Sequence, residues 1–191
     1  MRRGLAVLMM TVLLLLCGCK STETCLDDAI EFRAALVQAG GCSFRAQITA
    51  DFTDYVETFT LNCDCDADGT ARLELIEPDA LQGITATVSD RGGKITYDGL
   101  SVDFGLLAEG NVIPAAAPAI AVSCWSGEYI ASAGEADGIY CVTYEKDFEQ
   151  RRVRVDTCFK NGLPISAEVC YNNQNILQIT ITEFNLNGQK A

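Results

Sequence analysis

The sequence predicts a mainly β (α+β) protein, built as an antiparallel sheet of about eleven strands with one N-terminal helix and a short helical cover. Apolar and polar residues alternate with period two in short segments between residues 43 and 184. Turn residues such as Gly92-Gly93 and Asn161-Gly162 separate these segments. A helical period precedes the first segment, and only one apolar stretch interrupts the later ones. The spacing is therefore typical of strands joined by tight turns.

Eleven segments carry the strand pattern, the third of them containing Leu73 and Leu75 and ending before Pro78. Residues 112–126 are apolar without period two and predict a short helix and loop that cover one side of the sheet. The expected strands are residues 43–50, 56–65, 71–77, 83–89, 94–98, 100–106, 128–133, 138–146, 151–160, 164–172 and 175–184.

The helix precedes all of these strands. Thr24 is its expected N-cap, and Gly40-Gly41 ends it. Leu26, Ile30, Arg33 and Val37 follow helical spacing, with Ala29, Ala34 and Leu36 alongside. This pattern predicts one amphipathic helix of about fifteen residues.

Composition excludes several classes of function. The chain has 191 residues, 49% of them hydrophobic, which fits one folded domain and is too apolar for a disordered chain. A net charge of −12 argues against binding nucleic acid by phosphate neutralisation. There is no histidine, which excludes Ser-His-Asp and Cys-His catalysis and every metal site that needs histidine.

The N-terminus resembles a bacterial lipoprotein signal. Arg2 and Arg3 precede the apolar run 5–16, which is shorter than the ~20 residues that span a bilayer. The run ends in Leu-Cys-Gly-Cys-Lys, which is similar to a lipobox with Gly18 before the acylated cysteine. The resemblance implies a signal peptide over residues 1–18, lipidation with palmitate-like chains at Cys19, and a tether over residues 19–24. An ordinary secretory signal with coincidental cysteines is the alternative.

One domain, residues 25–188, follows the tether. Removal of residues 1–18 leaves a mature net charge of −14, which argues against a polybasic membrane patch and assigns attachment to the lipid. The expected location is the extracytoplasmic side of the cell membrane or the outer membrane.

Eight of the ten cysteines follow Cys19, and an even number in an exported domain predicts four disulfides. A hairpin turning near Thr53 makes Cys42 a neighbour of both Cys63 and Cys65, and a turn near residues 148–149 brings Cys141 to Cys158. Cys124 and Cys170 then form the remaining pair of the second half. A metal cluster has no CxxC spacing in its favour, and we expect no metal site. The eight cysteines are Cys25, Cys42, Cys63, Cys65, Cys124, Cys141, Cys158 and Cys170.

The segment Asp64-Cys-Asp-Ala-Asp-Gly69 resembles the start of a calcium loop. Its twelfth position is Leu75 where a bidentate glutamate belongs, so a hairpin turn rich in Asp and Gly is the favoured interpretation. The chain contains no GxSxG, P-loop or GxGxxG motif, and we expect neither enzymatic activity nor a cofactor.

The order of segments is similar to the LolA/LolB-like fold of lipoprotein carriers and membrane-anchored lipid-binding proteins. The resemblance covers residues 25–186 and rests on an ordered series of segments. They are the opening helix, Phe44-Arg-Ala-Gln-Ile-Thr-Ala-Asp-Phe, Phe59-Thr-Leu, the acidic Gly turn feeding Ala71-Arg-Leu-Glu-Leu-Ile-Glu-Pro78, Gly83-Ile-Thr-Ala-Thr-Val, the hairpin Ile95-Thr-Tyr-Asp-Gly and the late strands. It implies a curved, incomplete antiparallel β-barrel with helices as a lid, and an apolar cavity for acyl chains on its concave face. Spore-germination lipoproteins with a similar half-barrel act through protein partners.

A strand set with one apolar face needs a cover, and one helix with residues 112–126 is too little to fill a wide curved sheet. The unfilled volume suits acyl chains, although the same residues could equally form an ordinary core. The expected lining residues are Phe44, Ile48, Leu61, Leu73, Leu75, Ile84, Phe104, Ile120 and Trp125.

Three functions compete at this point. The first is a membrane-anchored lipoprotein that binds a lipid or lipoprotein by its acyl chains, with no covalent chemistry. The second is a structural or regulatory envelope lipoprotein that docks a protein partner and fills its own cavity. The third is an envelope hydrolase with two paired carboxylates in a cleft. A large open apolar cavity favours the first, and a filled core favours the second.

Overall fold

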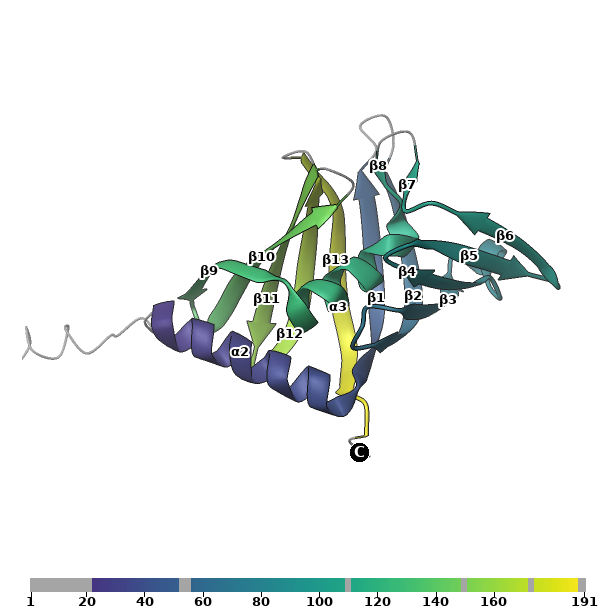
Figure 1. Ribbon diagram of the computed structural model, residues 1–191. Coiled ribbons are helices and arrows are strands. Elements are labelled where there is room, and N and C mark those ends of the chain that lie inside the picture. The colour runs from purple at the N-terminus through teal and green to yellow at the C-terminus, as the bar shows by residue number, and fades with distance from the viewer. Residues whose placement is uncertain (1–21, 52–55, 109–110, 149–150, 172–173, 189–191) are drawn as a thin grey trace, which may run out of the picture.

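The computed structural model describes residues 22–51, 56–108, 111–148, 151–171 and 174–188. Within these residues, eleven strands form one antiparallel sheet in the order β6-β5-β4-β3-β2-β1-β13-β12-β11-β10-β9, and β7 and β8 form a separate pair (Figure 1). The predicted signal peptide, Cys19 and the turn near Thr53 lie outside the described residues. The fold class predicted from the sequence is confirmed, because the sheet is antiparallel, curved and not closed.

Each of the eleven expected strands is present, and the bounds agree closely. Every neighbouring pair is antiparallel, and each pair except β1 with β13 joins strands that follow one another in the sheet by a short connection. The one long connection leads from β6 to β9. The strands are β1 (Gly41–Asp51), β2 (Val56–Asp66), β3 (Ala71–Glu77), β4 (Thr85–Ser89), β5 (Gly92–Tyr97), β6 (Leu100–Phe104), β7 (Leu107–Ala108), β8 (Asn111–Val112), β9 (Tyr129–Ala136), β10 (Ile139–Phe148), β11 (Arg151–Lys160), β12 (Leu163–Tyr171) and β13 (Gln174–Leu186).

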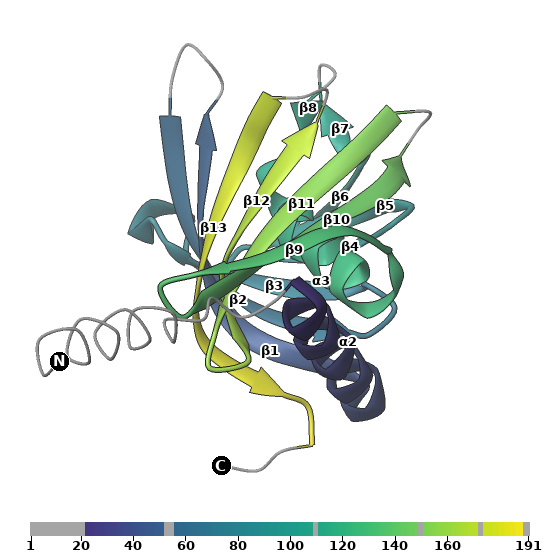
Figure 2. The same cartoon turned by 90° about the vertical axis from the view of Figure 1, so that its left-hand side faces the viewer.

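Alternation gives the sheet one apolar face and one polar face. In β1, Phe44, Ala46, Ile48 and Ala50 are buried, as their spacing predicts, and the residues between them are more exposed. Strands β10 to β13 bury the same alternate positions. The sheet curves around this apolar face, so that the buried rows of distant strands approach one another (Figure 2).

The N-terminal helix α2 (Thr22–Ala39) crosses the apolar face of the sheet. It begins two residues before the expected N-cap, and the predicted apolar face is only partly correct. Ala29 and Leu36 are buried, together with Cys25 and Phe32, which were not expected there. Leu26, Ile30 and Val37 are 38%, 50% and 51% exposed. Both stripes are apolar, and the larger aromatic Phe32 lies on the stripe that packs.

A cover segment connects the two edges of the sheet. It leaves edge strand β6, passes through β7, β8, the 3-10 helix η2 (Pro114–Ala116) and the helix α3 (Ala117–Gly127), and enters the other edge strand, β9. Eight of the eleven α3 residues are buried, so the helix lies against the concave side of the sheet. The apolar stretch 112–126 is therefore the predicted helix and loop. A second 3-10 helix, η1 (Asp79–Leu81), precedes β4.

None of the described helices has the length and apolarity needed to cross a membrane.

The structure confirms one predicted disulfide. Cys141 and Cys158 lie directly opposite each other on β10 and β11 and are bonded, with their Cα atoms 4.0 Å apart. Cys124 is a buried thiol, so the expected bond to Cys170 is not formed. The reason is geometric: Cys124 lies on α3 at the apolar face, whereas Cys170 lies beside Arg154 on the other face of the sheet.

The first half of the chain also differs from the expected four-disulfide framework. Cys42 lies opposite Cys65, one residue from the register expected from a turn near Thr53. Cys42, Cys63 and Cys65 are buried thiols at the apolar face. Burial in apolar surroundings raises the pKa of Cys42 to about 12, so this group behaves as a small neutral core residue.

Candidate functional site

The apolar face of β1 to β6 contains a cavity of about 370 Å³. This volume lies at the lower end of the range of about 300–1,000 Å³ found for ligand pockets. No lining residue has a charged or hydrogen-bonding side chain. The cavity therefore offers neither an acid–base group nor a nucleophile, and it suits an apolar ligand. Its lining residues are Ile48, Phe59, Leu61, Leu73, Leu75, Ile84, Ala86, Ile95, Phe104, Ile113, Pro114 and Ala115.

Local sequence explains why these side chains meet. Leu61 lies opposite Leu75 on β2 and β3, and Leu73 lies opposite Ala86 on β4. Rows of alternate residues from neighbouring strands thus point to one side. The small side chain of Ala86 leaves space in the middle of a row whose other members are large. Residues 113–115 line the cavity on the side of the cover, and η2 contacts both β1 and β4.

Six of the nine expected lining residues lie at this cavity, namely Ile48, Leu61, Leu73, Leu75, Ile84 and Phe104. The structure brings them together because they occupy the same face of β1 to β6. The lining residues expected from the sequence did not include Phe59, Ala86, Ile95 or residues 113–115, which also line the cavity. Strand alternation could have indicated the first three, whereas the place of the cover depends on tertiary packing.

The other three expected residues belong to the packed core. Phe44 is buried on β1, Ile120 and Trp125 are buried on α3, and none of them lines the cavity. The Trp125 ring contacts Phe32 of α2 at a centroid distance of 6.0 Å. Its Nε1 donates a hydrogen bond to Thr157 Oγ1 at 2.8 Å. This aromatic cluster fills the half of the concave face that α2 and α3 cover.

Arg33 of α2 fixes the end of the cover helix. Its guanidinium donates to the backbone oxygens of Trp125 and Glu128 at 2.9 and 2.6 Å, and to that of Cys124 at 3.3 Å. The Cys124 oxygen also accepts the Glu128 backbone N–H at 3.3 Å, whereas the Trp125 oxygen lies in the last turn of α3, where carbonyls lack an intrahelical donor. The guanidinium also lies 5.9 Å from the centroid of the Tyr144 ring. Burial raises the pKa of the Tyr144 phenol, so the side chain that faces the Arg33 guanidinium stays neutral.

A lysine makes a second connection to the cover. Lys146 Nζ of β10 donates to Ser123 Oγ at 2.5 Å and pairs with Glu128 Oε1 at 3.0 Å. Polar contacts therefore hold the C-terminal half of the cover. The contacts of Ile113, Pro114 and Ala115 at the cavity are apolar.

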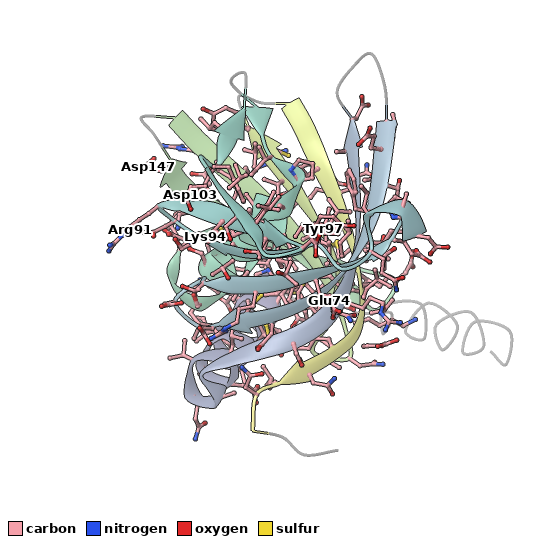
Figure 3. All side chains as sticks on the ribbon, turned by 90° about the vertical axis from the view of Figure 1, so that its right-hand side faces the viewer. Glu74, Arg91, Lys94, Tyr97, Asp103 and Asp147 are labelled. Atoms are coloured by element: carbon pink, nitrogen blue, oxygen red, sulfur yellow. A yellow bond between two sulfur atoms is a disulfide. The ribbon has the colours of Figure 1, made fainter. Side chains whose placement is uncertain are left out.

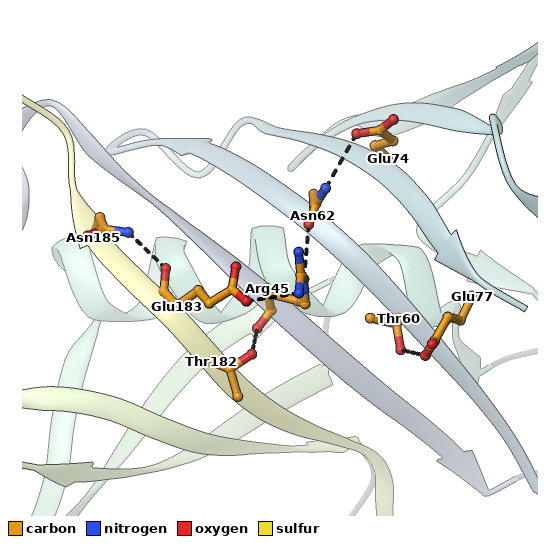
Figure 4. Close-up of polar contacts among 8 residues, drawn as sticks. All are labelled: Arg45, Thr60, Asn62, Glu74, Glu77, Thr182, Glu183 and Asn185. Carbon is orange, nitrogen blue, oxygen red and sulfur yellow. Dashed lines mark hydrogen bonds and ion pairs between the residues drawn. The ribbon is translucent and has the colours of Figure 1, made fainter. Parts of the chain in front are cut away.

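The opposite face of the sheet has a different chemistry. Arg45 Nη1 pairs with Glu183 Oε1 at 2.8 Å, and Arg45 Nε donates to Asn62 Oδ1 at 3.3 Å (Figure 4). Thr60 Oγ1 donates to Glu77 Oε2 at 2.6 Å on the same face. These side chains satisfy one another at the outer surface, which leaves the concave face as the place for an apolar ligand.

The calcium-like segment forms the turn between β2 and β3. Asp66 pairs with Arg72 at 2.9 Å, and Asp68 Oδ1 accepts a hydrogen bond from the Thr70 backbone at 2.8 Å. Gly69, at φ +88°, lies against Ser123 of α3. Across the described residues, no three His, Cys, Asp or Glu side chains are grouped as a metal site would need. The hairpin interpretation explains each of these residues.

Comparison with known proteins adds similarity in fold. No protein-family model matches the chain. No curated protein matches it in sequence. Solved structures do match over most of its length, with low sequence identity.

The matching structures include LolA superfamily protein NE2245 from Nitrosomonas europaea, at 9% identity and a TM-score of 0.47, covering 90% of this chain and 96% of that one. A DUF1329 family protein from Desulfovibrio piger matches at 12% identity and a TM-score of 0.45, covering 89% and 95%. LprF from Mycobacterium bovis matches at 11% identity and a TM-score of 0.39, covering 87% and 95%.

Proposed function

We propose that this protein is a membrane-anchored lipoprotein that binds acyl chains of a lipid or lipoprotein in the apolar cavity of its half-barrel. The observation that carries the proposal is the cavity itself, a volume of about 370 Å³ with no charged or hydrogen-bonding side chain in its lining. Water in such a space would lack hydrogen-bond partners. Each buried methylene contributes ~0.8 kcal/mol, so ten of them supply about 8 kcal/mol before the cost of ordering the chain.

The alternative function is that of a lipoprotein that docks a protein partner. It predicts that the protein's own side chains fill the cavity. The small side chains Ala86 and Ala115 in the lining leave it open instead. A hydrolase of the type considered above would need paired carboxylates in the cleft, and the lining of this cavity contains no carboxylate. Binding without covalent chemistry is therefore the function that the cavity supports best.

Anchoring at Cys19 is the second part of the proposal, and it rests on the lipobox-like sequence. Two residues separate Cys19 from Thr22 at the start of α2, so the two Cα atoms are three steps apart, a reach of about 10 Å at full extension. The domain would then lie next to its membrane. Replacing Cys19 by serine should release the protein from isolated membranes and remove the acyl mass from its N-terminal peptide. Retention of Cys19→Ser in the membrane fraction would contradict this part of the proposal.

Ligand binding is tested by filling the cavity. Ala86 lies in the middle of the lining, and Thr87, the next residue of β4, is exposed on the other face. Ala86→Phe should abolish uptake of a fluorescent fatty acid by the full-length protein, because the new ring occupies the space of the chain. Thr87→Phe adds the same ring outside the cavity and should leave uptake unchanged. Equal uptake by the two variants would exclude the cavity as the site.

A further inference from the structure

The hairpin of β5 and β6 at one edge of the sheet has an exposed apolar face. Ile95 lies opposite Val102, and Tyr97 lies opposite Leu100. Their exposed fractions are 36%, 66%, 52% and 75% in that order. We call these four residues the outer apolar face.

The other face of the same hairpin is polar. It carries Lys94 opposite Asp103 and Thr96 opposite Ser101, whose hydroxyl oxygens are 3.0 Å apart (Figure 3). The hairpin therefore already has a face suited to water. The hairpin is thus not apolar on both sides, and its apolar side chains are confined to the outer apolar face.

The outer apolar face continues the lining of the cavity without a break. Leu73, Ala86, Ile95 and Val102 lie directly opposite one another on four successive strands. The first three line the cavity, and Val102 lies beyond it. Exposure rises along the row from 4% at Leu73 to 36% at Ile95 and 66% at Val102. No polar side chain interrupts this row.

We propose that the outer apolar face binds a second acyl chain of the ligand whose first chain occupies the cavity. The inference rests on the proposed function and narrows its ligand class to lipids with at least two acyl chains.

The cavity does not extend to the end of this hairpin. Its lining runs from Ile48 on β1 to Phe104 on β6 and does not include Tyr97, Leu100 or Val102. A chain held in the cavity therefore leaves these three side chains uncovered. A second chain attached to the same headgroup would lie against them.

The chemistry of the outer apolar face also favours hydrocarbon over a peptide. The phenol of Tyr97 is its one hydrogen-bonding group, so the amides of a peptide lying across the four side chains would find few side-chain partners there. Hydrocarbon needs no such partner and gains from contact with all four side chains.

The experiment compares a one-chain and a two-chain probe. The full-length protein is reconstituted in phosphatidylcholine vesicles and irradiated with either a diazirine fatty acid or a phospholipid carrying diazirines on both chains. Labelled residues are mapped by mass spectrometry. We expect the fatty acid to label the cavity alone, Ile95 included, and the phospholipid to label both the cavity and residues 97–102. Tyr129, 70% exposed on the opposite edge strand, reports labelling by the bulk bilayer.

Two variants of β6 sharpen the test, since both side chains are exposed and neither substitution should prevent folding. Val102→Lys places a charge on the outer apolar face and should lower phospholipid capture about tenfold, because an ammonium group is costly to bury against hydrocarbon. It should leave fatty acid capture unchanged. Ser101→Lys places the same charge on the polar face and should change neither.

Four results would overturn the proposal. They are phospholipid labelling of the cavity without the hairpin, hairpin labelling no stronger than that of Tyr129, an equal loss of both probes in Val102→Lys, or crosslinking of the hairpin to another protein in place of the probe. Failure of the wild-type cavity to capture either probe would overturn the proposed function itself. The two failures are therefore distinguishable.

Discussion

Gly69 shows how a single residue sets the position of the cover. Its φ of +88° suits glycine, and a Cβ added there would lie 2.9 Å from Ser123 Cβ of α3. The acidic turn that resembles a calcium loop therefore packs against the cover helix α3. Asp66 and Asp68 are engaged by Arg72 and Thr70.

We expect Gly69→Ala to lower the free energy of unfolding by about 1–3 kcal/mol, through backbone strain and the clash with α3. Gly138 is the matched control, because its φ is +76° and a Cβ there would meet nothing within 4 Å. Urea denaturation of the two alanine variants separates strain from contact. Equal losses in both would mean that the contact with Ser123 is unimportant.

Buried thiols predict a pH dependence of stability. Burial raises the pKa of Cys42 and Cys124 from about 9 to about 12. Their unfolded forms ionise first, so the stabilisation is complete below pH 9 and is lost as the pH rises towards 12. Each thiol lowers the free energy of unfolding by up to about 1.4 kcal/mol per pH unit in this window.

The measurement is urea denaturation between pH 8 and 11. The double variant Cys42→Ala, Cys124→Ala should show a shallower decline than the wild type, whatever its stability at pH 8. If the free energy of unfolding fell equally with pH in the two proteins, these thiols would not contribute to the pH dependence of stability.

Arg33 connects two elements, because it belongs to α2 and binds the C-terminal carbonyls of α3. Arg33→Met keeps the apolar stem and removes the donors, and it should lower the free energy of unfolding by about 2 kcal/mol. Arg91→Met removes the same charge from a side chain that is 92% exposed and should be nearly neutral. Thermal unfolding compares the two, and similar melting temperatures would show that Arg33 does not hold the cover.

The hairpin of β10 and β11 has a covalent connection. Cys141 and Cys158 enclose a sequence separation of 17, for which loss of the disulfide should cost about 3 kcal/mol. Replacing both by serine should lower the free energy of unfolding by this amount. Dithiothreitol should destabilise the wild type equally and leave the variant unchanged. A further loss on reducing the variant would reveal another disulfide.

At the scale of the molecule, the strands were predictable because alternation and turn residues are local. The burial of alternate residues in β1 and the pairing of Cys141 with Cys158 both follow from local spacing. The packed stripe of α2 was not predictable, since the helix has two apolar stripes and only tertiary contact selects the one with Phe32. For the same reason, Phe44 could not be told from a cavity residue, because strand alternation gives its face of the sheet and the helices decide which half of that face is filled.

The pairing of β1 with β13 has a consequence for folding. Cys42 lies opposite Leu186, so the two central strands of the sheet are separated by nearly the whole domain in sequence. Non-local pairing of this kind is slow, because loop closure precedes any gain from contact. We expect β10 to β12 to gain amide protection before β1 in pulsed hydrogen exchange, and simultaneous protection would contradict this. A chain that emerges from a membrane N-terminus first would complete the centre of its sheet only after its last strand has crossed.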